Sequence, residues 1–367
     1  MIVYLIGTKA QYIKMAPVVL ETSARGLPFR LVLSGQHSET FDDLQQNFGL
    51  PAADLVLVGG SEAKDRISFA RWVRQALAAA KSPQAEELWR QASVIVVHGD
   101  TASALLGAYI GRRCGRPVAH VEAGLRSFNL LHPFPEEAIR ILVSRVATLH
   151  LCPDATAERN LARAAGERLV TGGNSLKDAL RLALAAQQQA QPRAARPYVV
   201  FSMHRQENLF KRRRLDSALR ILRSLSGIID VRFVLHPVTR KRLEQLGLMP
   251  ELEQQPGLEL VPRMDFFRFI GLIGAAAFVV TDGGSNQEEC AMLDIPCVLL
   301  RQATERPDGL EKEVLLGDLD EPRILEFARR HARAGRVLTL KDAHSPSAVI
   351  VGRLAAFLQT EAAGRAA

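Results

Sequence analysis

Residues 94–140 read VIVVHGDTASALLGAYIGRRCGRPVAHVEAGLRSFNLLHPFPEEAIR. Two apolar runs in this segment, Val94–Val97 and Pro117–Val121, break into polar residues, and a helical pattern lies between them. Strands that alternate with helices predict βαβ units and a parallel sheet. In such a sheet, the residues that follow the strands reach the crevice at the carboxyl ends, where ligands bind. The segment therefore predicts an α/β fold with polar side chains gathered at one edge of its sheet.

The alternation of strands and helices runs through the whole chain. In the first half we expect strands and helices at Ile2–Ile6, Gln11–Ala24, Arg30–Leu33, Asp65–Ala80, Val94–Val97, Ser103–Arg113, Pro117–Val121 and Glu136–Val146. After a stretch rich in Ala and Gln, strands are expected at Tyr198–Ser202, Val231–Leu235, Leu258–Val261, Phe278–Thr281 and Cys297–Leu300. The pattern predicts two doubly wound, Rossmann-like domains over residues 1–168 and 169–345. A final helix in 346–367 is expected to pack back on the first domain.

The composition is that of a globular protein without a membrane span. The 367 residues are 47% hydrophobic, and apolar runs such as Leu272–Val280 are too short to cross a bilayer. The opening MIVYLIGT lacks the basic start and the cleavage site of a signal peptide. The four cysteines are scattered, which is typical of free thiols in a reducing compartment. We therefore expect a cytoplasmic protein.

The net charge of +8 favours an anionic small molecule over nucleic acid as the partner. The basic residues are dispersed apart from Lys211–Arg214, whereas a nucleic-acid interface would need a broader patch with interleaved aromatic side chains. A positive balance suits a nucleotide diphosphate. The sequence has no cluster with metal-ligand spacing and no Gly-x-Gly-x-x-Gly after the first strand, so we expect neither a metal nor a bound NAD cofactor.

Three carboxyl groups follow the apolar runs of the opening segment. Asp100 comes after the first strand, Glu122 directly after the second, and Glu136 after a Pro-Phe-Pro turn. Carboxylates with tuned pKa values suit proton transfer at carbon. The alternative for Glu136 and its neighbour Glu137 is a solvated helix start, where acidic side chains favour the helix dipole. That alternative is weaker for Asp100 and Glu122, because both follow buried-strand patterns.

Two turns carry the features of a phosphate site. Gly7-Thr8 ends the first strand and opens a helix, so its backbone N–H groups can meet an anion, and Lys9 and Lys14 add positive charge. Gly283-Gly284-Ser285 follows a later strand and can present amides to a diphosphate in the same way. The alternative for a lone Gly-Thr pair is an ordinary turn.

The chain resembles the non-hydrolysing UDP-N-acetylglucosamine 2-epimerases. Besides the opening segment, the residues that carry the resemblance are Gly7–Pro17, Ser34–His37, Gly173–Leu180, Met203–Asn208, His236-Pro237, Thr281–Glu289 and Arg301–Pro307. The resemblance implies a GT-B arrangement with two domains facing a central cleft, a homodimer and a UDP-sugar substrate. It also implies epimerisation by elimination of UDP to a glycal and re-addition, which supplies a precursor for cell-envelope or capsular polysaccharide.

The resemblance assigns roles residue by residue. Asp100, Glu122 and Glu136 would exchange the proton at C2, in an order that the sequence leaves open. Lys14 and His204 would help the diphosphate leave and return, and Glu289 would hold the ribose hydroxyls. The substrate-binding set would be completed by Gly7, Thr8, Lys9, Arg140, Arg205, Phe269, Gly283, Gly284, Ser285 and Arg301. Core packing explains Phe269 equally well, and Gln36 with His37 matches a block that forms a regulatory nucleotide-sugar site in some bacterial relatives.

The chain departs from the family pattern near the expected site. Lys9 stands where the family has arginine, Gln11 where it has glutamate, and Ile139 where it has asparagine. A lysine keeps the charge but loses the bidentate fork of arginine. Residues 311–313 read Glu-Lys-Glu where a Gly or small polar residue is usual. These departures leave the exact UDP-sugar open, including a 2,3-diacetamido uronate.

Three other functions are compatible with the same sequence. A glycosyltransferase could use the same scaffold, because a fold does not choose a function, but it would need an acceptor groove. A hydrolysing epimerase would let water capture the glycal and release free sugar. A catalytically silent nucleotide-sugar sensor is favoured by the departures at Lys9 and Gln11.

Overall fold

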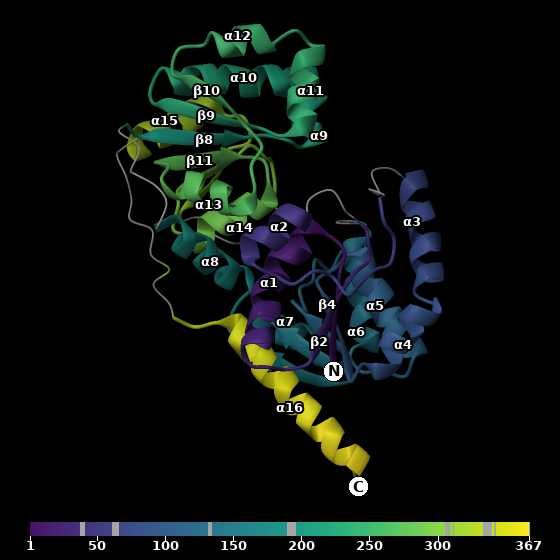
Figure 1. The fold of residues 1–367 in the computed structure, drawn as a ribbon. Helices are drawn as coiled ribbons and strands as arrows, with labels where there is room; N and C mark the ends of the chain where they lie inside the picture. The colour runs from purple at the N-terminus through teal and green to yellow at the C-terminus, as the bar shows by residue number, and fades with distance from the viewer. Residues whose placement is uncertain are drawn as a thin grey trace. The chain divides into compact units, whose positions relative to one another are not determined.

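The structure is a computed structural model that describes residues 1–36, 41–60, 66–130, 134–188, 196–304, 309–310, 312–332, 340 and 343–366. The chain forms two compact units, Met1–Ala179 with His344–Ala367, and Leu180–Ala343. The second unit is therefore an insertion between two segments of the first. Each unit is built around one parallel sheet with helices against it (Figure 1).

The sheet of the first unit has seven parallel strands among the described residues, in the order β3-β2-β1-β4-β5-β6-β7. The strands are β1 (Ile2–Ile6), β2 (Phe29–Leu33), β3 (Leu55–Val56), β4 (Val94–His98), β5 (Val118–Val121), β6 (Leu149–Cys152) and β7 (Glu167–Val170). The sheet is doubly wound, since successive strands are added in opposite directions on the two sides of the β1–β4 pair. Tyr4 is paired with Val96, so β1 and β4 end next to each other at this topological switch point.

The helices of the first unit cover both faces of its sheet. They are α1 (Lys9–Ala24), α2 (Phe41–Phe48), α3 (Arg66–Ala79), α4 (Pro83–Gln91), α5 (Ala102–Arg113), α6 (Glu136–Val146), α7 (Ala155–Asn160) and α16 (Pro346–Ala366). Because side chains alternate along a strand, Val3 and Leu5 of β1 share one core with Trp72 of α3 and Trp89 of α4. The neighbouring Tyr4 faces the other way, toward Thr22 of α1, with 2.6 Å between their hydroxyl oxygens.

The second unit repeats the same design. Its described strands are parallel in the order β10-β9-β8-β11-β12-β13, so the switch point lies between β8 and β11. The strands are β8 (Tyr198–Ser202), β9 (Asp230–Leu235), β10 (Leu258–Pro262), β11 (Phe278–Thr281), β12 (Cys297–Leu299) and β13 (Val314–Leu316). The expectation of two doubly wound, Rossmann-like α/β halves is confirmed.

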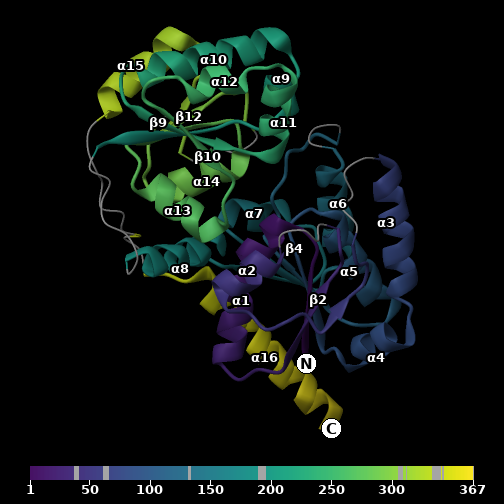
Figure 2. The same ribbon diagram turned by 45° about the horizontal axis from the view of Figure 1, so that its top comes forward.

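The core of the second unit lies between its sheet and two long amphipathic helices. Val199 and Phe201 of β8 pack with Leu222 of α10 and Phe327 of α15, whereas α13 and α14 lie on the other face (Figure 2). The helices are α9 (Gln206–Leu209), α10 (Arg212–Ser226), α11 (Pro237–Gln245), α12 (Met249–Glu253), α13 (Phe266–Gly274), α14 (Gly284–Met292) and α15 (Glu321–His331). Apolar residues three and four apart on α10 place its buried side on the sheet.

The division between the units falls inside α8 (Leu176–Gln188), after Ala179. The sequence pattern suggested a boundary after residue 168, but β7 pairs with β6 through Val170 and so still belongs to the first sheet. At the other end, α16 lies against α1, where the Arg25 guanidinium donates to the Ala348 carbonyl at 3.0 Å. The α16 side chains of Ile350 and Leu354 are buried in the first unit.

Three further observations, on membrane spans, metal sites and cysteines, concern the described residues as a whole. None of the helices in these ranges is both long and apolar enough to cross a membrane. Within the same ranges, no group of three or more His, Cys, Asp or Glu side chains could hold a metal ion. The four cysteines are free thiols.

Candidate active site

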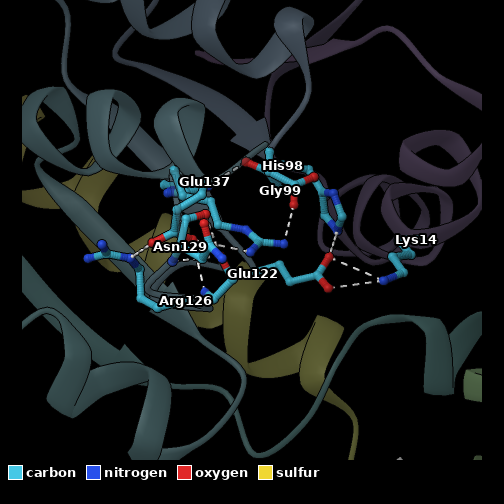
Figure 3. Close-up of polar contacts among 11 residues, drawn as sticks. Lys14, His98, Gly99, Glu122, Arg126, Asn129 and Glu137 are labelled. Carbon is cyan, nitrogen blue, oxygen red and sulfur yellow. Dashed lines mark hydrogen bonds and ion pairs between the residues drawn. The ribbon is translucent and has the colours of Figure 1, made fainter. Parts of the chain in front are cut away.

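Glu122 stands in a strained turn at the end of β5. Its φ angle is 61°, in the left-handed region that residues with a Cβ rarely adopt. Gly124, two residues on, also has a positive φ, and a Cβ there would collide with the Ala157 carbonyl. Such strained positions often occur at functional sites. The turn directs the Glu122 carboxylate toward α1 and the end of β4 (Figure 3).

Two basic side chains surround the Glu122 carboxylate. Lys14 Nζ of α1 lies 3.0 and 3.2 Å from its two oxygens, and His98 Nε2 at the end of β4 lies 2.9 Å from Oε2 (Figure 3). All three side chains are nearly buried, with exposed fractions of 9%, 5% and 12% for Lys14, His98 and Glu122. Burial alone would raise the pKa of Glu122, but the Lys14 ammonium and the His98 ring outweigh burial and hold this pKa well below its usual value. Glu122 is therefore an ionised carboxylate in a nearly dry site.

The Gly7-Thr8 turn differs from the sequence prediction of a free anion site. The backbone N–H groups of Gly7 and Thr8 both donate to Gln11 Oε1, at 2.9 and 3.2 Å. The Thr8 hydroxyl accepts in turn from the Gln11 amide, which completes a capping box at the start of α1. These amides are occupied by the protein itself, so they are not open to a phosphate.

The glycine at position 7 has a packing reason instead. A Cβ there would collide with the hydroxyls of Ser34 and Ser103, which lie 2.7 Å from each other. The NH2 group of the Gln11 side chain also makes a contact, because Nε2 donates to the His98 carbonyl at 2.6 Å. Gln11 thus ties the start of α1 to the end of β4.

A second charged chain of contacts runs through Asp100. The Asp100 carboxylate is bonded to Arg140 Nη2, and Arg140 Nη1 also lies 3.5 Å from Glu137 Oε2. Glu137 accepts from Arg126 Nε at 2.5 Å and from the Ser127 backbone N–H at 2.9 Å. Glu137 is fully buried, so the interpretation of this residue as a solvated helix start is wrong.

Glu136 is the first residue of α6 and has a different environment from its neighbour. Its Oε2 atom is buried and has no hydrogen-bond partner among the described residues. Pro135, the N-cap residue, offers no side chain that could cap the helix. Glu136 therefore keeps an unused buried acceptor, while Glu137 is fully engaged.

In the second unit, His204 follows β8 at the switch point, opposite the end of β11. Asp282 is fully buried and accepts from the backbone N–H groups of His204 and Arg205, both at 3.0 Å, and from Asn208 Nδ2 at 3.0 Å. The His204 ring stacks on His236 with 5.2 Å between ring centroids, and its Nδ1 lies 3.3 Å from Asp282 Oδ1. The carboxylate thus holds the backbone of His204 and lies close to its ring.

The start of α14 lies beside His204. Gly283 is the N-cap residue, and no side chain caps this helix. A Cβ on Gly283 would meet Asn286 Oδ1 at 2.7 Å and the His204 ring at 3.0 Å, so glycine is needed for the close approach. An uncapped helix start offers backbone N–H groups and a positive dipole end to an anion. Gly284 and Ser285 form the first positions of this helix, as the sequence pattern predicts.

Glu289 is buried one helical turn further along α14. Its Oε2 accepts from Asn286 Nδ2 at 3.0 Å, and Asn286 Oδ1 lies 3.0 Å from the Thr281 hydroxyl oxygen. Glu288 is also buried. Both glutamates of the pair therefore point away from bulk water.

The other predicted site residues lie on different elements of the two units. Lys9 is the first residue of α1, Phe269 is half-buried on α13, and Arg301 is buried just after β12. Gln36 Oε1 accepts from the Ser103 hydroxyl at 2.7 Å. His37, Glu305–Pro307 and Glu311 lie outside the described residues.

Sequence reasoning missed four residues that organise these groups. They are His98 beside Glu122, Glu137 between two arginines, Asp282 under His204, and Asn286 beside Glu289. His98 and Asp282 each directly follow or end a predicted strand, so their positions carried a usable signal. The positions of Glu137 and Asn286 carried no such signal, because their contacts form only in the folded protein.

Comparisons with known proteins point to one family. A family model described as UDP-N-acetylglucosamine 2-epimerase matches residues 21–346. A relative of that name from Methanocaldococcus jannaschii is 29% identical over 87% of this chain and 89% of its own length. A relative of the same name from Bacillus subtilis is 28% identical over 88% of this chain and 85% of its own length.

Solved structures share the fold over nearly the whole chain. The M. jannaschii UDP-GlcNAc 2-epimerase in complex with UDP-GlcNAc and UDP superposes with a TM-score of 0.77 at 25% identity, covering 96% of this chain and 99% of its own. The enzyme from Neisseria meningitidis bound to UDP-GlcNAc gives 0.75 at 24% identity over the same shares. With a family model that spans most of the sequence, the chain belongs to the UDP-N-acetylglucosamine 2-epimerase family.

Proposed function

We propose that this protein interconverts UDP-N-acetylglucosamine and UDP-N-acetylmannosamine, or a close UDP-2-acetamido sugar, by the non-hydrolysing route. A base takes the C2 proton, its bonding electrons form the C1–C2 double bond, and the C1–O bond breaks with its electron pair on UDP. The UDP oxygen then adds back to C1 of the 2-acetamidoglucal, while an acid delivers a proton to the opposite face of C2. Elimination and re-addition together balance without an oxidant.

The observation that carries this proposal is the Lys14–Glu122–His98 cluster. The Glu122 carboxylate lies in a nearly dry site with an ammonium 3.0 Å away, and it is ionised, which a base requires. The negative charge of a diphosphate beside Lys14 would offset this ammonium and raise the pKa of Glu122 toward the range of a working base. Glu136 has a buried oxygen without a partner in the described residues, so this oxygen is open to a substrate. We therefore assign proton removal in one direction to Glu122 and proton return to Glu136, with the roles exchanged in the reverse reaction. Asp100, paired with Arg140, is the third carboxyl group that we propose to take part in the proton exchange.

The second unit supplies groups that suit UDP. The uncapped start of α14 at Gly283–Ser285, together with His204 and Arg205, matches a diphosphate in charge and in hydrogen-bond donors. Glu289 provides a buried carboxylate for ribose hydroxyls, and Phe269, half-buried on α13, can pack against the base. Lys14 and His204 are proposed to neutralise the diphosphate as it leaves and returns.

The test follows hydrogen at C2. Purified protein is incubated with UDP-N-acetylglucosamine in D2O, without added NAD or metal, and the products are identified by NMR. We expect the manno epimer with deuterium at C2. Product that keeps its C2 hydrogen would exclude elimination, free N-acetylmannosamine would identify a hydrolysing enzyme, and no turnover with any of a panel of UDP-sugars would favour a sensor. Transfer to an added acceptor would identify a glycosyltransferase.

We further propose that the protein acts as a homodimer in the cytoplasm and supplies a precursor for cell-envelope or capsular polysaccharide. Four free thiols in a protein of this size suit a reducing compartment. The dimer follows from the family resemblance. Native mass spectrometry tests it, and a mass of one chain at micromolar concentration would contradict it.

A further inference from the structure

Glu137 has more basic partners than any structural role in a helix start requires. It lies in the first turn of α6, is fully buried, and accepts from Arg126 and from the Ser127 backbone N–H, with Arg140 at 3.5 Å. Burial would raise the pKa of Glu137, but the Ser127 amide and the Arg126 guanidinium outweigh it, so its pKa lies below the usual value. A buried carboxylate held by two arginines is costly to assemble and is not needed for stability alone, since apolar side chains can replace such clusters.

The two arginines lead in different directions. Arg126 belongs to the segment that leaves the strained Glu122 turn, and its guanidinium also lies over the Phe128 ring at 5.2 Å. Arg140, one helical turn beyond Glu137, bonds to Asp100 at the end of β4. Glu137 is thus the common acceptor between the Glu122 turn and the Asp100 carboxylate (Figure 3).

We propose that Glu137 is a positioning residue that fixes Asp100 through Arg140 and the Glu122 turn through Arg126 and Ser127. This inference rests on the proposed function for the roles of Asp100 and Glu122. It separates the two neighbouring glutamates, because Glu136 keeps a free oxygen for chemistry while Glu137 aligns the groups around it. Removing the Glu137 charge leaves a neutral amide that must point its NH2 group at one of the donors.

The first arm of the test needs no turnover. Hydrogen exchange followed by mass spectrometry reports on the Ser127 amide, which donates to Glu137 at 2.9 Å. In Glu137→Gln we expect exchange of the peptide that contains Ser127 to be at least about tenfold faster than in the wild type. The matched control is Glu136→Gln, which should leave that exchange unchanged. Equal exchange in the wild type and Glu137→Gln would overturn the proposal, whether or not the wild type epimerises UDP-sugars.

The second arm measures coupling to Asp100. Glu137→Gln should lower kcat by about tenfold or more, with KM and the Kd for UDP within twofold, because only the alignment of acid–base groups is lost. In an Asp100→Asn background the same substitution should lower kcat by a smaller factor than in the wild type, since one of the two groups that it aligns is already gone. Fully additive losses would overturn positioning through Arg140. If Glu137→Gln does not fold, Glu137→Asp, which keeps the charge on a shorter side chain, carries the same two measurements with smaller expected effects.

Discussion

Three carboxyl groups of one chemical type have three different environments in the first unit. Glu122 lies between Lys14 and His98, Asp100 is paired with Arg140, and Glu136 retains a buried oxygen without a partner in the described residues. Carboxyl groups with different surroundings can take different roles in one reaction. The roles proposed for the three groups therefore rest on their neighbours and not on their residue types.

The carboxyl groups themselves give the first prediction. Asp100→Asn, Glu122→Gln and Glu136→Gln should each lower kcat by about two orders of magnitude or more, the usual scale for a lost acid–base group. The Kd for UDP should change much less, because most of the residues proposed to bind UDP belong to the second unit. Steady-state kinetics and calorimetric titration with UDP measure the two effects. A variant that lost UDP affinity but kept its turnover per bound substrate would contradict the assignment.

Asp282 gives a prediction about UDP binding, whereas the preceding one concerns turnover. Asp282→Asn removes one of the oxygens that accept from the His204 and Arg205 amides and presents an NH2 group to them. With His204 no longer held, the Kd for UDP should rise by about tenfold, corresponding to a loss of roughly one charged hydrogen bond. Asp216→Asn is the matched control, because Asp216 makes only an exposed pair with Arg212 on α10 and should leave UDP binding unchanged. Equal Kd values for both variants would contradict this role of Asp282.

At the scale of single elements, the start of α1 is held by one side chain. Gln11 caps the Gly7 and Thr8 amides and donates to the His98 carbonyl. Gln11→Leu leaves these three buried groups without partners and should lower the free energy of unfolding by about 2 kcal/mol or more. Gln11→Glu keeps the two acceptor bonds and should cost less. Urea unfolding followed by circular dichroism compares the variants, and a Leu variant as stable as the Glu variant would argue against the capping role.

Strand β5 carries a histidine that makes stability depend on pH. Burial is the main reason that the pKa of His120 is lowered to about 4, and its Nε2 lies 2.8 Å from the Gly99 carbonyl. An unfolded histidine titrates near its ordinary value, so the unfolded state binds a proton first as the pH falls. The contribution of His120 to the free energy of unfolding is therefore complete above about pH 6.5. As the pH falls toward 4, the free energy of unfolding decreases by up to about 3 kcal/mol.

The measurement compares urea unfolding at pH 7 and pH 4.5 in the wild type and in His120→Gln. The glutamine can still donate to Gly99 but does not titrate. Between the two pH values, the variant should therefore lose about 2 kcal/mol less of its free energy of unfolding than the wild type loses. The difference between the proteins isolates His120 from the carboxyl groups, which titrate in both. An identical pH dependence would show that His120 takes up no proton on unfolding.

Fully buried strands could be predicted from the sequence, whereas the half-buried edge strand β7 could not. β1, β8 and β11 have the predicted bounds, because each is a continuous run of buried residues. β7 reads Glu-Arg-Leu-Val and is only half-buried at the sheet edge, so its residues differ little from a loop. A strand of this kind is defined by its neighbour and not by its own pattern.

The site shows the same limit. The sequence predicted that Asp100 and Glu122 follow strand ends, and they do. It could not predict that the Asp282 carboxylate accepts from an amide 78 residues earlier, or that the Gly7 and Thr8 amides are occupied by Gln11. These contacts depend on which side chains reach a turn once the sheet has formed.

At the scale of the whole molecule, the design is used twice. Each unit has a doubly wound sheet, and in each the polar residues gather where the strand order reverses, after β1 and β4 or after β8 and β11. Open α/β sheets bind ligands at such switch points. The duplication gives one chain two such sheet edges, one for the proposed acid–base groups and one for the proposed anion-binding groups.

The discontinuity of the first unit leads to the last prediction. Leu354 of α16 is fully buried, so Leu354→Ala should cost the first unit about 3 kcal/mol, whereas exposed Gln359→Ala on the same helix should cost almost nothing. Hydrogen exchange read by peptide should show faster exchange in α1 and unchanged exchange in β8 and β9. Equal acceleration in both units would mean that they unfold as one.

The docking of α16 against α1 also determines the order in which the protein can be completed during synthesis. The ribosome makes α1 before Leu180–Ala343 and α16 after it. The second unit is continuous and can finish folding as soon as it has emerged. The first unit must wait with part of its apolar surface uncovered until Ile350, Val351 and Leu354 arrive. The half of the protein that is translated first is therefore the half that is finished last, and it is the one that depends on protection during translation.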